Sequence, residues 1–192
     1  IGKSKNTKTK NAWQDYLHLI DYFYLEADYL AINISSPNTK NLRELSAHEN
    51  LELLMEKISQ KKVQLIDMHK KNTPIFVKLS PDETDDNLKN LIEVSEKNNI
   101  DGFICCNTTS EHSYPNPGGM SGAMLTQDAE NMLKKVATFK HEKSILIASG
   151  GVMSADDVKE RLDNSADLVQ LYTGYIYEGN SLLKKALKIS SY

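Results

Sequence analysis

Each of five apolar segments that the sequence predicts as strands ends in small polar side chains or in glycine. The first segment, 29–34, leads directly into serine, asparagine and threonine residues around Pro37. Because proline has no amide hydrogen to donate to a neighbouring strand, the chain must leave the sheet here. The residues at the strand ends that could bind a ligand are Asn33, Ser35, Ser36, Asn38 and Thr39; Lys78 and Ser80; Asn107 and Thr108; Gly150 and Gly151; and Thr173 and Gly174.

Lys78 is a charged residue within a predicted buried strand, 75–80. Period-two alternation puts it on the same face as Phe76 and Ser80. An isolated ammonium is costly to bury, so this lysine must either form a structural ion pair or serve a function. The functional interpretation is a cation beside an electron-rich cofactor ring, whose redox chemistry a fixed positive charge would tune.

Glycines follow the last two predicted strands, in Gly150-Gly151 and Tyr172-Thr173-Gly174. In (β/α) barrels the loops after the seventh and eighth strands commonly bind phosphate through backbone amides. These segments would then form a phosphate-binding cup. The alternative is that the glycines only permit tight turns.

The asparagines at the strand ends, with Thr108, offer donors and acceptors to a planar small molecule that is rich in hydrogen-bonding groups. The alternative is that they form caps and turns, where asparagine is common. No Ser-His-Asp arrangement supports Ser35 or Ser36 as an acyl-transfer nucleophile, and periodicity does not choose between the two serines.

The cysteines and histidines give no sign of a metal site. Cys105 and Cys106 are adjacent on a predicted strand, where successive side chains point to opposite faces, so two reduced thiols are expected. The five histidines show no ligand spacing with each other or with carboxylates. We assign no metal.

Helical and extended patterns alternate along the whole chain. Strands are predicted at 29–35, 75–80, 103–107, 145–148 and 168–172. Helices are predicted at 13–27, 51–66, 88–98, 129–139 and 182–187, and Ser154 with Asp157 resembles a capping box that opens a further short helix. Strands that are apolar on both faces indicate a parallel sheet wrapped by helices.

The α/β pattern fits either a barrel or an open doubly wound sheet. No Gly-x-Gly-x-x-Gly follows the first strand, and polar residues end every strand rather than gathering at one switch point. This favours a (β/α)8 TIM barrel, of which residues 1–192 supply five full strands, about strands 4–8, as one partial domain. About three strands must come from elsewhere.

Composition is that of an ordinary globular protein, with 40% hydrophobic residues, 26% charged residues and a formal net charge of −3. Nothing indicates binding to nucleic acid, because the lysines at 3, 5, 8 and 10 form the only short basic run and precede a helix. No apolar run reaches the roughly 18 residues that span a bilayer, and no signal peptide is visible.

Six motifs occur in this order along the chain: Ala31-Ile32-Asn33-Ile34-Ser35-Ser36-Pro37-Asn38-Thr39, Val77-Lys78-Leu79-Ser80-Pro81-Asp82, Asn99-Ile100-Asp101-Gly102, Asn107-Thr108-Thr109, Gly118-Gly119-Met120-Ser121-Gly122 and Leu168-Val169-Gln170-Leu171-Tyr172-Thr173-Gly174. Together they resemble the quinone-dependent (class 2) dihydroorotate dehydrogenases over essentially all 192 residues. The resemblance implies an FMN-dependent barrel that oxidises dihydroorotate to orotate in pyrimidine biosynthesis, with a quinone reoxidising the flavin.

The resemblance also implies a catalytic role for Ser36, since a serine in place of the class 1 cysteine marks class 2. Ser36 would take a proton from C5 of the substrate while hydride leaves C6 for N5 of the flavin. A serine is too weak an acid to do this unaided, so a proton relay and a closed site are needed. The segment after Asn38, which contains Leu42 and Leu45, is the candidate lid.

Other site residues follow from the same motifs. Asn33 would contact flavin and substrate, and Lys78 would lie beside the flavin ring. The remaining substrate contacts would be Asn38, Asn107 and Thr108, and the flavin and its phosphate would be held by Gly122, Gly151, Tyr172 and Thr173. Cys106 occupies a flavin-contacting position where the family usually has threonine.

By this resemblance Ile1 falls at the end of the third barrel strand. The earlier strands, a substrate-binding lysine and the helical segment that meets quinone and membrane would then lie outside this sequence. The complete protein is expected to be a monomer on the cytoplasmic side of the cell membrane. The chain alone is expected to be soluble, unstable and inactive, because an open sheet exposes two edges and its inner face.

Two alternative functions stay open at this point. The chain could be a non-catalytic barrel fragment or binding module that needs a partner chain. It could also belong to another FMN-barrel oxidoreductase that acts on a related pyrimidine.

Overall fold

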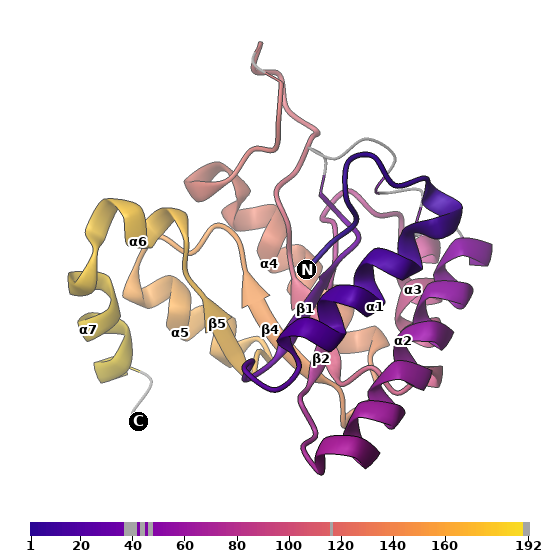
Figure 1. Ribbon diagram of the computed structural model, residues 1–192. Helices are drawn as coiled ribbons and strands as arrows, with labels where there is room; N and C mark the ends of the chain where they lie inside the picture. The colour runs from indigo at the N-terminus through magenta and orange to yellow at the C-terminus, as the bar shows by residue number, and fades with distance from the viewer. Residues whose placement is uncertain (37–41, 43–44, 46–47, 116, 190–192) are drawn as a thin grey trace.

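The protein contains one parallel β-sheet whose strands follow each other in sequence order (Figure 1). The computed structural model describes residues 1–36, 42, 45, 48–115 and 117–189. The strands are β1 (Leu30–Asn33), β2 (Ile75–Lys78), β3 (Gly102–Cys105), β4 (Ile145–Ser149) and β5 (Leu168–Gln170), and each pairs in parallel with the next. The five predicted strands are therefore confirmed as a five-stranded part of a (β/α) barrel.

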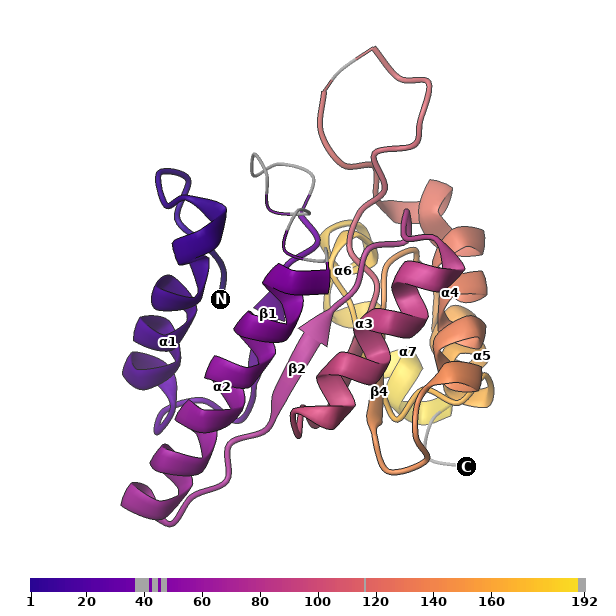
Figure 2. The same cartoon turned by 90° about the vertical axis from the view of Figure 1, so that its right-hand side faces the viewer.

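Helices connect the strands and pack against one another outside the sheet, as Figures 1 and 2 show. They are α1 (Ala12–Phe23), α2 (His48–His69), α3 (Asp85–Lys97), α4 (Thr126–Phe139), α5 (Ala155–Asp163), α6 (Thr173–Glu178) and α7 (Asn180–Ile189), with the 3-10 helices η1 (Thr9–Asn11) and η3 (Gly122–Leu125). The predicted capping box is confirmed at the start of α5, where Ser154 and Asp157 each accept from the other's backbone N–H. Within the described residues, no helix combines the length and apolarity needed to cross a membrane.

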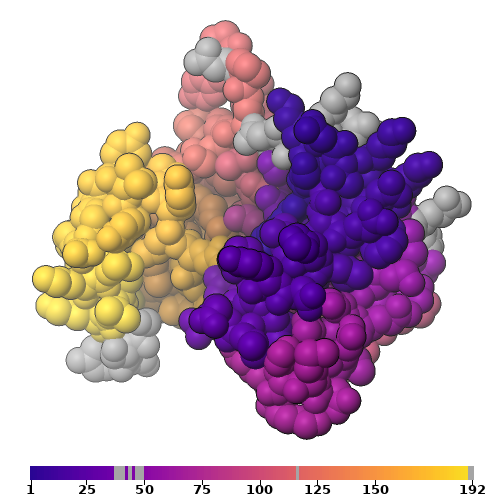
Figure 3. Space-filling model, viewed as in Figure 1, coloured from indigo at the N-terminus to yellow at the C-terminus, as the bar shows by residue number. Residues whose placement is uncertain are grey.

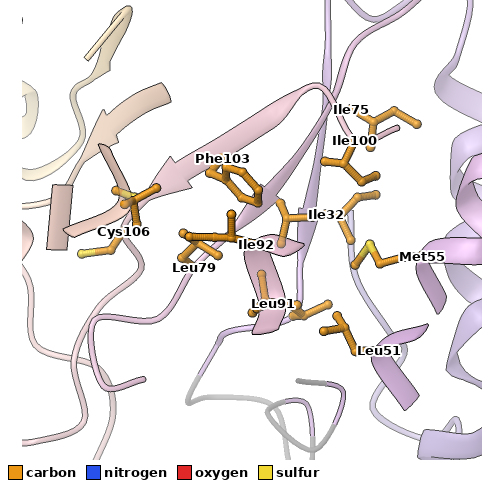
Figure 4. Packing of buried hydrophobic residues seen from close by; sticks show 14 of the residues in the cluster. Ile32, Leu51, Met55, Ile75, Leu79, Leu91, Ile92, Ile100, Phe103 and Cys106 are labelled. Carbon is orange, nitrogen blue, oxygen red and sulfur yellow. The ribbon is translucent and has the colours of Figure 1, made fainter. Parts of the chain in front are cut away.

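The main core lies between the sheet and these helices. Figure 4 shows Ile32 and Phe103 from the strands and Met55 and Leu91 from α2 and α3 within this cluster. The helical stripes are apolar at three- and four-residue spacing, so each helix buries one face against the sheet and exposes the other.

The inner face of the sheet is covered, contrary to the sequence-based expectation. Phe76, Ile104 and Ile147 form a separate cluster there and are 3%, 0% and 1% exposed. The ring of Tyr29 packs edge-on against Phe76 with 5.4 Å between ring centroids, and its hydroxyl accepts a hydrogen bond of 2.8 Å from Gln170. Because Gln170 is on β5, the curvature of the sheet brings its two edge strands close enough for their ends to meet.

The edge of β1 carries a short parallel pairing with the first residue. The N-terminal ammonium of Ile1 donates to the carbonyl oxygen of Ala31 at 2.7 Å, and the N–H of Asn33 donates to the carbonyl oxygen of Ile1 at 2.9 Å. This alternation is the pattern of neighbouring parallel strands.

Two features were not predicted from the sequence. Residues 173–178 form helix α6, which is too short for a periodic pattern and is separated from α7 by Gly179 at φ 58°. In the segment between β3 and α4, Thr109 and Met120 form an antiparallel bridge and η3 begins at Gly122, and no sequence pattern predicted either feature. Figures 1 and 2 show the chain between the two bridge residues extending away from the rest of the molecule.

Candidate functional site

A cavity of about 460 Å³ opens at the carboxyl ends of β2 to β5. In Figure 3 the surface is hollowed between the C-terminal helices and the N-terminal part of the chain. The described residues that line the cavity are Tyr29, Lys78, Cys106, Asn107, Thr108, Ser121, Gly122, Leu125, Ser149, Gly150, Gly151, Val152, Gln170, Leu171, Tyr172 and Thr173.

Most of the residues that the sequence singled out meet at this cavity. Those that line it are Lys78, Cys106, Asn107, Thr108, Gly122, Gly150, Gly151, Tyr172 and Thr173. Asn33 reaches it through a hydrogen bond to Asn107. Ser36 is half-buried and is not among the described lining residues, and Asn38 lies outside the described part of the chain.

A hydrogen-bonded group joins the ends of β1 and β3. The Asn107 side-chain amide donates to Asn33 Oδ1 at 3.2 Å and to Ser35 Oγ at 3.1 Å. Asn33 Oδ1 also accepts from the backbone N–H of Ser35 at 3.2 Å. Since Ser35 is buried, these contacts fix the start of the Ser35-Ser36 turn relative to the cavity wall.

Asp82, which follows β2, fixes the residues that come directly after Asn107 and Thr108 in the chain. Its carboxylate accepts hydrogen bonds from the hydroxyl of Thr109 and from both the backbone N–H and the hydroxyl of Ser110. The N–H of Asn107 donates to the carbonyl oxygen of Leu79 at 2.9 Å. The polar pair at the end of β3 is therefore held in place by residues that follow β2 and by residues at the end of β1.

Lys78 projects into the cavity from the inner face of β2 and is half-buried. No carboxylate of the described residues lies within ion-pair distance of its Nζ, so the structural ion pair considered above is absent from that part of the chain. Burial lowers the pKa of Lys78, because removing an ammonium from water disfavours its charged form. A ligand with electron-rich oxygen or nitrogen atoms would supply the missing partner.

The two thiols are buried but lie in different surroundings. Cys105 belongs to the main core, whereas Cys106 also lines the cavity. Burial raises the pKa of Cys106 to about 12, although the positive charges of Lys78 and Arg161 oppose this effect. Cys106 is therefore a neutral thiol at neutral pH, which argues against a nucleophilic role.

The backbone of three glycines, which we call the glycine wall, forms part of the cavity lining. Gly122, Gly150 and Gly151 have φ values of 74°, 93° and 67°, a region that other residues rarely adopt. A Cβ atom on Gly151 would lie 2.3 Å from Cα of Thr126, so no other residue fits there without displacing α4. The neighbouring Thr173 hydroxyl lies 3.2 Å from that of Ser121, and Thr173 begins α6 instead of ending a strand as expected.

Sequence reasoning missed four polar residues of the cavity, namely Tyr29, Ser121, Ser149 and Gln170. Gln170 carried the same signal as Lys78, since it is a polar residue between apolar neighbours on a predicted strand. Tyr29 gave no such signal, because an aromatic residue at the start of a strand is ordinarily assigned to the core.

A polar cavity at the carboxyl ends of parallel strands is the arrangement found in (β/α) barrel enzymes. The family model described as dihydroorotate dehydrogenase matches residues 1–189, so the chain belongs to the dihydroorotate dehydrogenase family.

Curated relatives and a solved structure agree with this assignment. Dihydroorotate dehydrogenase (quinone) of Dichelobacter nodosus is 40% identical and that of Halorhodospira halophila 37% identical, each over the whole of this chain and 58% of the relative. A crystal structure of DHODH from Eimeria tenella in complex with ferulenol superposes with a TM-score of 0.90 at 28% identity, covering 99% of this chain and 55% of that one. The chain thus spans somewhat more than half the length of these relatives.

Proposed function

We propose that this chain forms the catalytic and flavin-phosphate-binding part of a quinone-dependent dihydroorotate dehydrogenase. The reaction is the oxidation of dihydroorotate to orotate in pyrimidine biosynthesis, with FMN as the cofactor and a quinone as the final acceptor. The relatives carry this name, and the remaining barrel strands correspond to the portion of them that this chain does not cover.

The residues around the cavity fit FMN. The volume of about 460 Å³ is within the range of small-molecule sites. The glycine wall leaves backbone amides accessible to a phosphate, and Lys78 offers an ammonium without a carboxylate partner among the described residues. Gly122, Gly151, Tyr172 and Thr173 would hold the flavin and its phosphate. Asn33 and Cys106 would contact the flavin, and Lys78 would lie beside its ring.

FMN, when bound, supplies the acceptor for the hydride that leaves C6 of dihydroorotate. The protein must bind and orient the substrate and remove the C5 proton. Asn33, Asn38, Asn107 and Thr108 would bind the ring and carboxylate of the substrate. The hydrogen bonds that fix Asn107 to the ends of β1 and β2 support this role, because orientation requires rigid hydrogen-bonding groups.

Ser36 would accept the C5 proton as the general base. Its neighbour Ser35 is held by Asn33 and Asn107, which supports a fixed position for the following residue. Exclusion of water would favour the proton transfer. Leu42 and Leu45 of the proposed lid are both buried in the main core, and the residues between and around them lie outside the described part.

The contacts with the quinone and with the membrane belong to other parts of the complete protein in this proposal. We assign the quinone site and peripheral membrane attachment to the portion of the relatives outside this chain, and we propose a monomer as the active form. No residue of the described part is assigned to either contact.

The observation that carries this proposal is the meeting of Lys78, Asn107 and the glycine wall at one cavity. The test is to incubate the protein produced from its natural gene with FMN and to add dihydroorotate without oxygen. Loss of the visible absorbance of the oxidised flavin is expected. A protein that binds FMN but is reduced only by a different pyrimidine would overturn the substrate assignment.

Replacing Lys78 by methionine is expected to have opposite effects on stability and on FMN binding. The free energy of unfolding without FMN should increase, because a half-buried ammonium without a carboxylate partner among the described residues is removed. The affinity for FMN should fall roughly ten- to a hundredfold, the value of a hydrogen bond to a charged group. Denaturant titration and flavin fluorescence measure the two effects.

Lys62 is the matched control for Lys78. It is also buried, but its Nζ lies 2.5 Å from a carboxylate oxygen of Asp101. Lys62→Met should therefore lower the free energy of unfolding, since it leaves a partly buried carboxylate without its partner. If both substitutions destabilise the protein to the same extent, Lys78 is a structural residue.

A further inference from the structure

The guanidinium of Arg161 on α5 is buried, and only part of its hydrogen-bonding capacity is satisfied by the described residues. Arg161 is 1% exposed and is the bulkiest of the fully buried side chains. Its Nη2 donates to the carbonyl oxygen of Thr126 at 2.8 Å, and its Nη1 lies 3.7 Å from Oε2 of Glu130. Nε and Nη1 have no hydrogen-bond acceptor among the described residues. Burying a guanidinium in this way is expensive, so its retention requires a reason beyond packing.

Thr126, the residue that Arg161 holds, is in direct contact with the glycine wall. The Thr126 hydroxyl donates to the carbonyl oxygen of Gly151 at 2.7 Å. The Cα of Thr126 is also the atom that a Cβ on Gly151 would meet at 2.3 Å. There is no free space between the first turn of α4 and the Gly151 turn, so the position of one determines the position of the other.

Glu130 is shared between Arg161 and a second cation. It lies one turn after Thr126 on α4, and Lys134 donates a hydrogen bond to its Oε1. The hydrogen bond from Lys134 keeps the pKa of Glu130 below its usual range, with a further contribution from Arg161. One carboxylate therefore faces two cations, Arg161 from α5 and Lys134 from its own helix, and is not available to Arg161 alone.

The charge of Arg161 acts on the cavity wall together with charges of the opposite sign. Cys106 is affected by the positive charges of Lys78 and Arg161 and, in the opposite sense, by the negative charges of Asp82 and Asp128. The contact through Thr126, rather than a net positive field, therefore connects Arg161 to the glycine wall.

We infer that Arg161 is a positioning residue for the phosphate group of FMN, which acts by fixing Thr126 and, through it, the turn at Gly150 and Gly151. This inference rests on the proposed function. Arg161 does not line the cavity, so it acts through Thr126 rather than by touching the ligand. A role confined to joining α5 to α4 would affect stability alone.

The test compares the affinities of FMN and riboflavin, which differ only in the phosphate. Arg161→Met keeps the approximate length of the side chain and removes its charge and its hydrogen bond. We expect the dissociation constant of FMN to rise about tenfold, the loss of one charge-assisted hydrogen bond, and that of riboflavin to change little. Arg161→Lys should give an intermediate value for FMN. Quenching of flavin fluorescence measures both constants.

Lys159→Met is the matched control, because it removes a positive charge from the exposed side of the same helix, where Lys159 pairs with Asp163. Neither dissociation constant should change. Thr126→Val provides a second route if Arg161→Met does not fold: it leaves Arg161 in place, removes the hydroxyl bond to Gly151 and should also weaken FMN binding more than riboflavin binding.

The outcomes separate this inference from the proposed function. A wild-type protein that binds neither flavin contradicts the proposed function. A wild-type protein that prefers FMN, together with Arg161 and Thr126 variants that keep the same preference, overturns the role of Arg161. Equal weakening of both flavins in the variants also overturns it, since that result describes a general loosening of the cavity.

Discussion

Replacement of Ser36 by alanine is expected to slow reduction of bound FMN by dihydroorotate about 10²- to 10⁴-fold, the usual contribution of a general base. Binding of FMN should be unchanged, because Ser36 is not among the described residues that line the cavity. Stopped-flow measurement of flavin absorbance under single-turnover conditions gives the rate of the chemical step directly. The deficit should persist at saturating dihydroorotate, since the lost interaction belongs to the transition state.

Ser35→Ala is the matched control for this experiment. The Ser35 hydroxyl accepts from Asn107 and lies 3.4 Å from Asn33 Oδ1, so its loss should loosen the groups proposed to bind the substrate. We expect a rise of several-fold in the dihydroorotate concentration needed for half-maximal reduction, the effect of about one hydrogen bond, with a smaller change in rate. A larger loss of rate for Ser35→Ala than for Ser36→Ala would make Ser35 the base.

The comparison of these two serines also shows where sequence reasoning stops. Alternation along a strand assigns faces only while the chain is extended, and β1 ends at Asn33. The turn that follows is built from side-chain hydrogen bonds to Asn107, which is 74 residues away from Asn33 in sequence. Contacts of this kind depend on the packing of two strands and cannot be read from local pattern.

The strands and the longer helices could be predicted because their patterns reflect burial on one or two faces. Lys78 illustrates this success: alternation assigned it to the face of Phe76, and the structure has it on that face with the cavity beyond. The contact between Tyr29 and Gln170 illustrates the limit, since it joins residues 141 positions apart and exists only because the sheet curves. It also explains why the inner face is more covered than an open sheet would suggest.

The sequence alone could not distinguish Arg161 from the exposed charged residues of the same helix. Arg161 lies on a helix with other charged residues, such as Lys159 and Glu160, and nothing in the spacing separates the buried cation from the exposed ones. Its burial results from the packing of α5 against the start of α4, which is a property of the barrel as a whole. Charged residues at such positions are found only when the tertiary structure is known.

Residues 1–192 as a separate chain are expected to show no measurable oxidation of dihydroorotate. Among the described residues, the outer edge of β1 has only two hydrogen-bond contacts, both with Ile1, and β5 pairs with β4 alone. Leu168 on β5 is 53% exposed, which is unusual for an apolar residue of a barrel strand. Edge strands without partners open readily, and the proposed substrate and flavin groups lie at the ends of these strands.

Hydrogen exchange followed by mass spectrometry gives an independent readout of the same chain. Amides of β2, β3 and β4 should exchange slowly, because these strands have partners on both sides and lie over the main core. Amides of β1 and β5 should exchange rapidly. Joining the chain to the portion that its relatives carry in addition should slow exchange in both edge strands and restore turnover. Turnover by residues 1–192 alone at the rate of the joined protein would show that five strands suffice for the reaction.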